Sequence, residues 1–123
     1  MSLLISTAHH AARNQASITL AGAASTLRFY TAEGGTLLAT RTLTNPAGTI
    51  NAQGRIVLGA SAADLVAETG SVGWAEWCDS AGAVMAAGTV TDQAGAGDFK
   101  LAGTSGTTIY QGGRVLLDDV ILG

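Results

Sequence analysis

The sequence predicts an all-β fold, a single-domain β-sandwich or jelly-roll with a short N-terminal helix or arm. Two observations predict it. Short apolar or alternating segments recur from about Leu27 onward at spacings of roughly 8–12 residues, which is typical of sandwiches and barrels. Clusters of Gly, Asn, Asp and Ser, the residues that favour turns, separate these segments. The expected strands are Thr26–Thr31, Thr36–Leu43, Arg55–Gly59, Ser71–Cys78, Ala83–Thr91, Phe99–Ala102, Thr107–Tyr110 and Arg114–Leu122.

We expect residues 1–25 to form the N-terminal arm or short helix and residues 26–123 to form the β domain. Ser6 can cap a helix, and alanines at positions 8, 11, 12 and 16 favour one as far as about Ser17. The stretch Ser17–Leu20 then alternates in polarity, which favours a strand. Residues 61–67 are the second place where the sequence is compatible with a helical turn.

Turn residues predict how neighbouring strands connect. Thr26–Thr31 and Thr36–Leu43 flank Gly34-Gly35, so we expect them to form a hairpin. The Asn45-Pro46 pair is expected to end the second of these strands, because proline has no N–H to donate to a sheet. Asp79–Gly82 begins with Asp and ends with Gly, as type I turns do, and is expected to join two further strands.

The two tryptophans, Trp74 and Trp77, are three residues apart, so a regular strand places them on opposite faces. We expect Trp74 in the core, because Val72 and Cys78 share its side of such a strand. Trp77 is then expected to face a partner or a sugar. A bulge in the strand would instead bury both rings.

Composition limits the classes of function. The 123 residues fit one domain, and 47% of them are hydrophobic. Many of these are alanines, so the core is expected to be thin and to gain stability from oligomerisation or docking. Only 12% of residues are charged, and the six basic ones are scattered, which argues against nucleic-acid binding and against a basic membrane-surface stripe. Such low charge indicates a surface that is partly covered in the working protein.

Three apolar residues, Leu3, Leu4 and Ile5, stand where a chain end would ordinarily fray. The run is too short, and its flank too poor in basic residues, for a signal peptide or a membrane span, so we expect synthesis in a cytoplasm. We expect the three residues to pack on a neighbouring subunit or a larger partner. Tyr30 and Trp77 are the other candidates for partner contact, each on the strand face expected to point away from the core.

Residues that could carry chemistry are few and poorly grouped. His9 and His10 are adjacent and point in different directions, so they are expected to be exposed or at an interface and not metal ligands. Asp118-Asp119 is expected to guard an edge strand, because the spacing of a Ca²⁺ loop is absent. Cys78 lies far in sequence from both histidines and is expected to be a buried apolar residue. Serine-nucleophile and phosphate-binding motifs are also absent, so the sequence predicts no enzyme, no metal site and no cofactor.

Five segments carry a resemblance to a known group of proteins: Leu27–Thr31 (LRFYT), Leu37–Thr40 (LLAT), Thr69–Ala75 (TGSVGWA), Asp79–Gly82 (DSAG) and Gly112–Val115 (GGRV). From Leu27 to its C-terminus the chain resembles small virion-associated proteins of tailed bacteriophages. Members of that group tend to have L-R-I-Y-T, L-L-A-T-L-T-L, T-G-T-A-G-W-F-R, D-S-A-G and A-G-G-T-V at these places. The chain departs from the pattern at Glu76-Trp77-Cys78, and its N-terminal helix is truncated relative to the group.

The resemblance implies a compact β-sandwich or jelly-roll that sits on a phage head as a cement or decoration protein. We therefore predict a virion structural protein, made in the host bacterial cytoplasm, that bridges subunits of the major capsid protein as a homodimer or higher oligomer. A protein that binds only the assembled shell stabilises that shell by linkage. Two alternatives stay open: a tail or baseplate component, and a carbohydrate-binding module that uses Trp74 or Trp77.

Overall fold

The computed structural model describes residues 6–60, 66–101, 106–113 and 121–122. It confirms the expected fold class, an all-β domain preceded by a short helix. In chain order the elements are α1 (Thr7–Ala21), β1 (Thr26–Tyr30), β2 (Leu37–Ile50), β3 (Ile56–Ala60), β4 (Gly70–Ser71), β5 (Trp74–Cys78), β6 (Val84–Asp92), β7 (Phe99–Leu101), β8 (Thr108–Ile109) and β9 (Ile121–Leu122).

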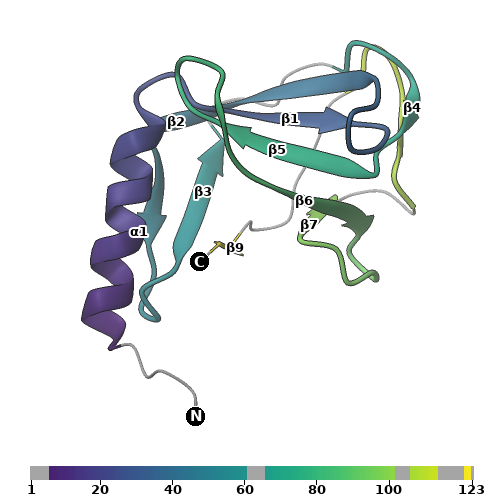
Figure 1. Cartoon of the computed structure of the whole chain (residues 1–123). Helices are drawn as coiled ribbons and strands as arrows, with labels where there is room; N and C mark the ends of the chain where they lie inside the picture. Colours follow the sequence, from purple (N-terminus) through teal and green to yellow (C-terminus); the bar gives the residue numbers. More distant parts are fainter. Residues whose placement is uncertain (1–5, 61–65, 102–105, 114–120, 123) are drawn as a thin grey trace.

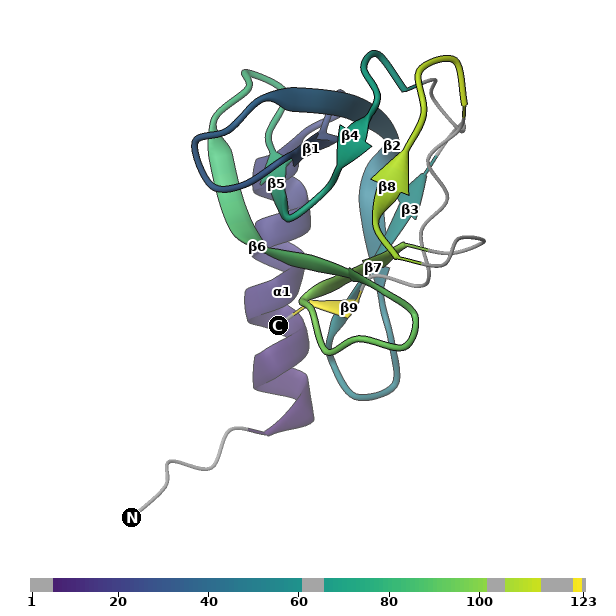
Figure 2. The ribbon, with the colours of Figure 1, turned by 90° about the vertical axis from the view of Figure 1, so that its right-hand side faces the viewer.

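Seven of these strands form one sheet, in the order β7–β6–β5–β1–β2–β3–β9, and β4 pairs with β8 in a separate two-stranded ribbon. Within the sheet only β6 and β7 run parallel to each other. The sheet curls, so that β6 and β7 pass below β1 and β5, while α1 stands along β2 and β3 (Figure 1 and Figure 2). The curl lets one twisted sheet enclose a core on its inner side.

Both expected hairpins are present. The Thr31 N–H donates to the Thr36 carbonyl oxygen (3.0 Å) at the β1–β2 turn. At the β5–β6 turn the Gly82 N–H donates to the Asp79 carbonyl oxygen (3.0 Å), and the Asp79 carboxylate accepts two further backbone N–H groups of the turn at 2.9 Å each. An aspartate that satisfies the turn's own backbone is the physical reason why Asp favours the first turn position.

The helix α1 runs about one turn further than expected, and the strand expected over residues 17–20 is wrong. Ser6 caps the first turn, as expected, by accepting a backbone N–H at 3.1 Å. The helix continues because one of its faces packs on the sheet, and this packing outweighs the local alternation. The buried side chains of that face are Asn14, Ile18 and Ala21. Gly22, with φ of 78°, then ends the helix.

The strand β2 continues to Ile50, so the expectation that Asn45-Pro46 ends it is wrong. Its pairing with β3 shifts register between Leu43 and Gly48, and the proline falls within this irregularity. A bulge of this kind leaves residues outside the ladder, so the missing proline N–H breaks no hydrogen bond there. The first half of β2 pairs with β1 and the second half with β3, so the bulge joins two parts of the curled sheet.

The strand expected over Ser71–Cys78 is interrupted at Gly73 and becomes β4 and β5. A Cβ at Gly73 would lie 2.6 Å from the Thr31 carbonyl oxygen, so only glycine fits where the two chain segments cross. The helical turn considered over residues 61–67 lies largely outside the described residues. Most of the strand expected over Arg114–Leu122 lies outside them too, and β9 is its described part.

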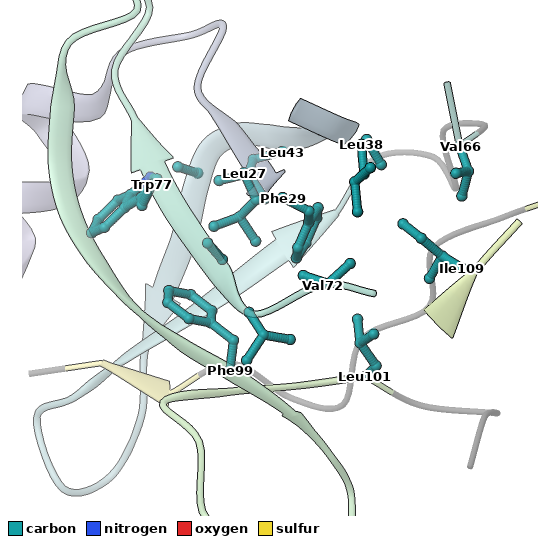
Figure 3. Packing of buried hydrophobic residues seen from close by; sticks show 14 of the residues in the cluster. Leu27, Phe29, Leu38, Leu43, Val66, Val72, Trp77, Phe99, Leu101 and Ile109 are labelled. Atoms are coloured by element: carbon teal, nitrogen blue, oxygen red, sulfur yellow. The ribbon is translucent and has the colours of Figure 1, made fainter. Parts of the chain in front are cut away.

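The core fills the inner side of the sheet (Figure 3). Its large side chains come from the central strands, from β7 and from the segments that lead into the β4–β8 ribbon. They include Leu27, Phe29, Leu38, Leu43, Val66, Val72, Trp77, Phe99, Leu101 and Ile109. Each buried side chain of this size contributes about 1.5–3 kcal/mol of transfer free energy, so these few residues carry most of the apolar stabilisation.

Polar contacts attach α1 at its middle and at its C-terminal end. The Asn14 side-chain amide donates to the Gly54 carbonyl oxygen in the β2–β3 turn at 2.7 Å. Ser80, in the β5–β6 turn, donates to the Ala21 carbonyl oxygen from its backbone N–H (2.9 Å) and its hydroxyl (3.1 Å), and its hydroxyl accepts from the Ala24 N–H (2.9 Å). These bonds fix the direction of a helix that buries few apolar side chains.

Candidate interaction surfaces

The two tryptophans lie on opposite faces of β5, but the expected assignment of the faces is wrong. Trp77 is 3% exposed and pairs across the sheet with Leu27, inside the core (Figure 3). Trp74 is half-buried and pairs with Tyr30 on the outward face. Trp77 is therefore a core residue that cannot reach a partner, whereas Tyr30, the other aromatic candidate for partner contact, lies on the outward face.

Two irregularities explain the reversal. The assignment counted alternation outward from Val72 and back from Cys78, both of which are buried. Val72 precedes the break at Gly73, and Cys78 follows a register shift in the β5–β6 pairing, between Trp77 and Cys78. Side chains do not keep alternating between the two faces across either irregularity. The burial of Val72 and Cys78 therefore does not show which face Trp74 lies on.

A buried serine holds the Trp77 ring in place. The Trp77 indole Nε1–H donates to the Ser25 hydroxyl oxygen at 2.8 Å, and that hydroxyl donates to the Cys78 carbonyl oxygen at 2.7 Å. Ser25 is fully buried between the end of α1 and the start of β1. Both polar side chains are thus satisfied inside the core. Sequence reasoning missed Ser25, since it ends a run of small residues that resembles a loop.

Cys78 is fully buried, as expected. Burial raises the pKa of its thiol, and the opposing influence of the Arg28 guanidinium is smaller. A thiol with a raised pKa stays protonated near neutral pH and is a poor nucleophile. Within the described parts of the chain, no three His, Cys, Asp or Glu side chains come together where they could hold a metal ion.

An aromatic pair lies on the outward face of the central strands. Tyr30 of β1 stands directly opposite Trp74 of β5, with Leu37 of β2 beyond Tyr30 and Thr89 of β6 beyond Trp74. Leu37 is 41% exposed, and both aromatic rings are half-buried. We call these four residues the aromatic row.

A polar row lies beside the aromatic row on the same face. It consists of Thr40, Arg28, Glu76 and Ala87, paired in that order across β2, β1, β5 and β6. Its first three side chains are half-buried, because each stands among neighbours on a central strand. We call these four residues the charged row.

The outward side of α1 is a second exposed surface. Ala12, Ala16 and Leu20 are exposed at four-residue spacing, opposite the buried face, and Leu20 is 68% exposed. Arg13 is the only Lys, Arg, Asp or Glu residue of α1. Arg13, Gln15 and Thr19 are exposed beside these three residues, so the outward side is a narrow apolar stripe with polar neighbours and few charges. His9 is exposed at its edge, as expected.

Asp92 joins two loops at the end of β6. One of its carboxylate oxygens accepts the Ala94 and Gly95 N–H groups at 3.1 Å each, and the other accepts the Gly106 N–H at 2.8 Å. The hydrogen bond from Gly106 is the largest cause that holds the pKa of this carboxyl below its ordinary value. Asp92 is therefore a structural carboxylate that ties the β6–β7 turn to the segment before β8.

We expect Asp92→Asn to lower the melting temperature at neutral pH, because the amide presents a donor where the carboxylate accepts backbone N–H groups. A carboxyl whose folded-state pKa is lowered contributes stability above the unfolded pKa of about 3.9, and this stability is lost as the pH falls through the folded-state value. The difference between wild type and variant should therefore shrink in acid. Thermal unfolding followed by circular dichroism at neutral pH and at about pH 2.5 measures it. Glu33→Gln, at an exposed carboxylate in the β1–β2 turn, is the control, and an equal difference at both pH values would contradict this role.

The remaining sequence candidates are not part of the described surfaces. Leu3, Leu4, Ile5 and Asp118-Asp119 lie outside the described residues. In the part of the chain that is described, no helix has the length and apolar character needed to cross a membrane. No protein-family model, curated protein or solved structure matches this chain.

Proposed function

We propose that this chain is a structural protein of a tailed-phage virion, a cement or decoration protein that binds the major capsid protein and bridges its subunits as a homodimer or higher oligomer. The motif resemblance supports this class of protein. The segments that carry it, Leu27–Thr31, Thr69–Ala75 and Asp79–Gly82, fold into β1, the β4–β5 segment and the β5–β6 turn. They therefore build the centre of the sheet and the turn against which α1 ends.

One observation carries the proposed mode of binding, namely the apolar stripe of Ala12, Ala16 and Leu20 on the outward side of α1. Ala12 and Ala16 allow close approach of a partner backbone, and Leu20 supplies an apolar anchor next to them. The hydrogen bonds of Asn14 and Ser80 hold the opposite side of the helix on the domain. The face is thus presented on a fixed helix, which lowers the entropy lost on binding.

Binding of many copies to one shell would allow a small contact per copy to give stable attachment. A patch of one helix face buries less surface than a stable pairwise interface of about 1,200–2,000 Å². On a shell, many copies in an oligomer bind at once, and linked weak contacts raise the overall affinity by orders of magnitude. Binding only to the assembled shell then increases the free energy needed to separate capsid subunits.

We expect the double variant Ala12→Arg/Ala16→Arg to lose binding to phage heads while the domain stays folded. Both positions are exposed, so the free protein tolerates arginine, whereas a docked helix would place two unpaired charges in an apolar contact, with a loss of roughly tenfold or more in affinity for each. Cosedimentation of the purified chain with heads and, separately, with tails of the phage that encodes it measures the binding.

Gln93→Arg/Gln111→Arg is the matched control, because it adds the same two charges at exposed turn positions. It should bind heads as the wild type does. Binding to tails alone would replace the cement function by a tail or baseplate function. Binding to neither particle, or equal loss in the control variant, would overturn the proposal.

A further inference from the structure

In the aromatic row Trp74 presents carbon surface, and Tyr30 and Thr89 each add a hydroxyl group. Trp74 is half-buried, and its indole Nε1 has no solvent contact and no hydrogen-bond partner among the described residues. The exposed part of the indole is therefore its hydrocarbon surface. Tyr30 stands on the adjacent strand, directly opposite Trp74, so the two rings lie next to each other on the outward face (Figure 1 shows β1 beside β5).

The charged row provides the polar groups beside this carbon surface. Arg28 and Glu76 form a direct cross-strand pair one step along from Tyr30 and Trp74, and Thr40 extends the row on β2. A Cβ at Gly82 would lie 3.3 Å from an Arg28 guanidinium nitrogen, so glycine leaves room for this side chain at the β5–β6 turn. One positive and one negative side chain cancel, and donors and acceptors are both present.

We propose that the aromatic row and the charged row together bind a neutral, extended oligosaccharide of pyranose units. The apolar C–H face of a pyranose stacks on the carbon surface of an aromatic ring, whose π face is negative and attracts those hydrogens. Neighbouring strands are about 4.8 Å apart, close to the length of one pyranose unit, so a chain that crosses the strands can place successive units over Tyr30 and Trp74. The hydroxyl groups of the sugar then reach Glu76 and Thr40 one row away, while the Arg28 guanidinium lies further along, at the β5–β6 turn.

The same features favour a sugar over a protein partner. Protein interfaces are depleted of charged residues at their centres, whereas here Glu76 stands one row from the aromatic pair. The Asp98 carboxylate, which accepts the Thr89 N–H (3.0 Å) and hydroxyl (3.2 Å), adds a negative charge at the end of the aromatic row and disfavours an acidic sugar. The face is built from elements other than α1, so this binding does not depend on the proposed attachment to a virion.

Nuclear magnetic resonance titration of the full ¹⁵N-labelled chain with cellohexaose, and separately with the hexamer of β-1,4-linked N-acetylglucosamine, tests the proposal. At millimolar sugar we expect the indole N–H signal of Trp74 and the backbone amides of Tyr30 and Glu76 to shift. The indole signal of Trp77, which is bonded to the buried Ser25 hydroxyl, should stay in place. The two indoles thus give an internal control in one sample.

A substitution series adds a second measurement. Glu76→Gln keeps the shape of the side chain and should weaken binding about fivefold to tenfold, because a charged acceptor is lost. Trp74→Ala should weaken it further, provided that its amide spectrum shows an intact fold. Tyr110→Ala removes an aromatic ring that is 66% exposed elsewhere and should leave the affinity unchanged.

Three outcomes would overturn the proposal. They are an absence of shifts with both sugars, an equal loss in Tyr110→Ala and Glu76→Gln, and shifts of the same residues that grow with protein concentration in the absence of sugar. The last would assign this face to a second copy of the chain. Loss of head binding in the Ala12→Arg/Ala16→Arg variant affects none of these three outcomes. The proposals of capsid binding and of sugar binding can therefore fail independently.

Discussion

Trp77→Ala is expected to leave the domain largely unfolded at 37 °C. The ring is 3% exposed in the middle of the core, and truncation of a buried tryptophan costs about 3–5 kcal/mol. The Ser25 hydroxyl, which is fully buried, would also lose the hydrogen bond that it accepts from the indole N–H at 2.8 Å. Small domains are stable by only about 5–15 kcal/mol, so one substitution removes a large part of the total.

Urea unfolding followed by circular dichroism measures this loss. Trp77→Phe keeps an aromatic ring and removes the N–H donor, so it should fall between wild type and Trp77→Ala. Trp74→Ala is the matched comparison, since it deletes the same side chain from the outward face three residues away, and it should lose less stability. A greater loss in Trp74→Ala than in Trp77→Ala would mean that the faces of β5 have been assigned the wrong way round.

Gly54→Ala should separate the β2–β3 turn from α1. Gly54 has φ of 78°, and a Cβ there would lie 2.8 Å from the Thr7 carbonyl oxygen and 3.0 Å from the Ala11 backbone nitrogen. Backbone atoms of a helix cannot move aside as a flexible side chain can. The left-handed backbone alone costs about 1–2 kcal/mol for a residue with a Cβ, and displacement of the turn would also break the hydrogen bond from Asn14 to Gly54.

Gly34→Ala provides a close control for this prediction. Gly34 has a similar φ of 73° in the β1–β2 turn, and a Cβ there would meet nothing within 4 Å. The two variants therefore share the backbone cost, and the difference between their free energies of unfolding measures the contact between turn and helix. Hydrogen exchange of the α1 amides should accelerate in Gly54→Ala alone. Equal stability and equal exchange in both variants would show that this contact contributes nothing.

Local features of this chain were predictable where a side chain forms hydrogen bonds with backbone groups close to it in sequence. The Ser6 cap and the Asp79 turn use side chains that bond backbone groups a few residues away. The β1–β2 hairpin follows from a glycine turn between two strand-forming segments. Such interactions depend on spacing along the chain, which the sequence shows directly.

The surfaces were less predictable, because they depend on strand register. Tyr30 was expected on the outward side and lies there, since burial alternates along the whole of β1, although its pairing with β2 shifts register between Phe29 and Tyr30. Trp74 was assigned to the core, because alternation was counted across the break at Gly73 and across the register shift at Cys78. The charged row was not anticipated at all, because Arg28 and Glu76 become neighbours only when β1 pairs with β5.

By itself the sequence determined that this is an all-β chain with an N-terminal helix, where the β1–β2 and β5–β6 turns fall and how little charge it carries, because composition and local propensity decide these properties. Only the tertiary structure decided which tryptophan is buried, how far α1 extends and that Pro46 lies within β2. Each of these depends on groups far apart in the chain, as in the hydrogen bond from Ser25 to Cys78, which spans 53 residues. Contacts of that kind exist only after the sheet has closed on its core, so they outweigh local preference without leaving a pattern in the sequence.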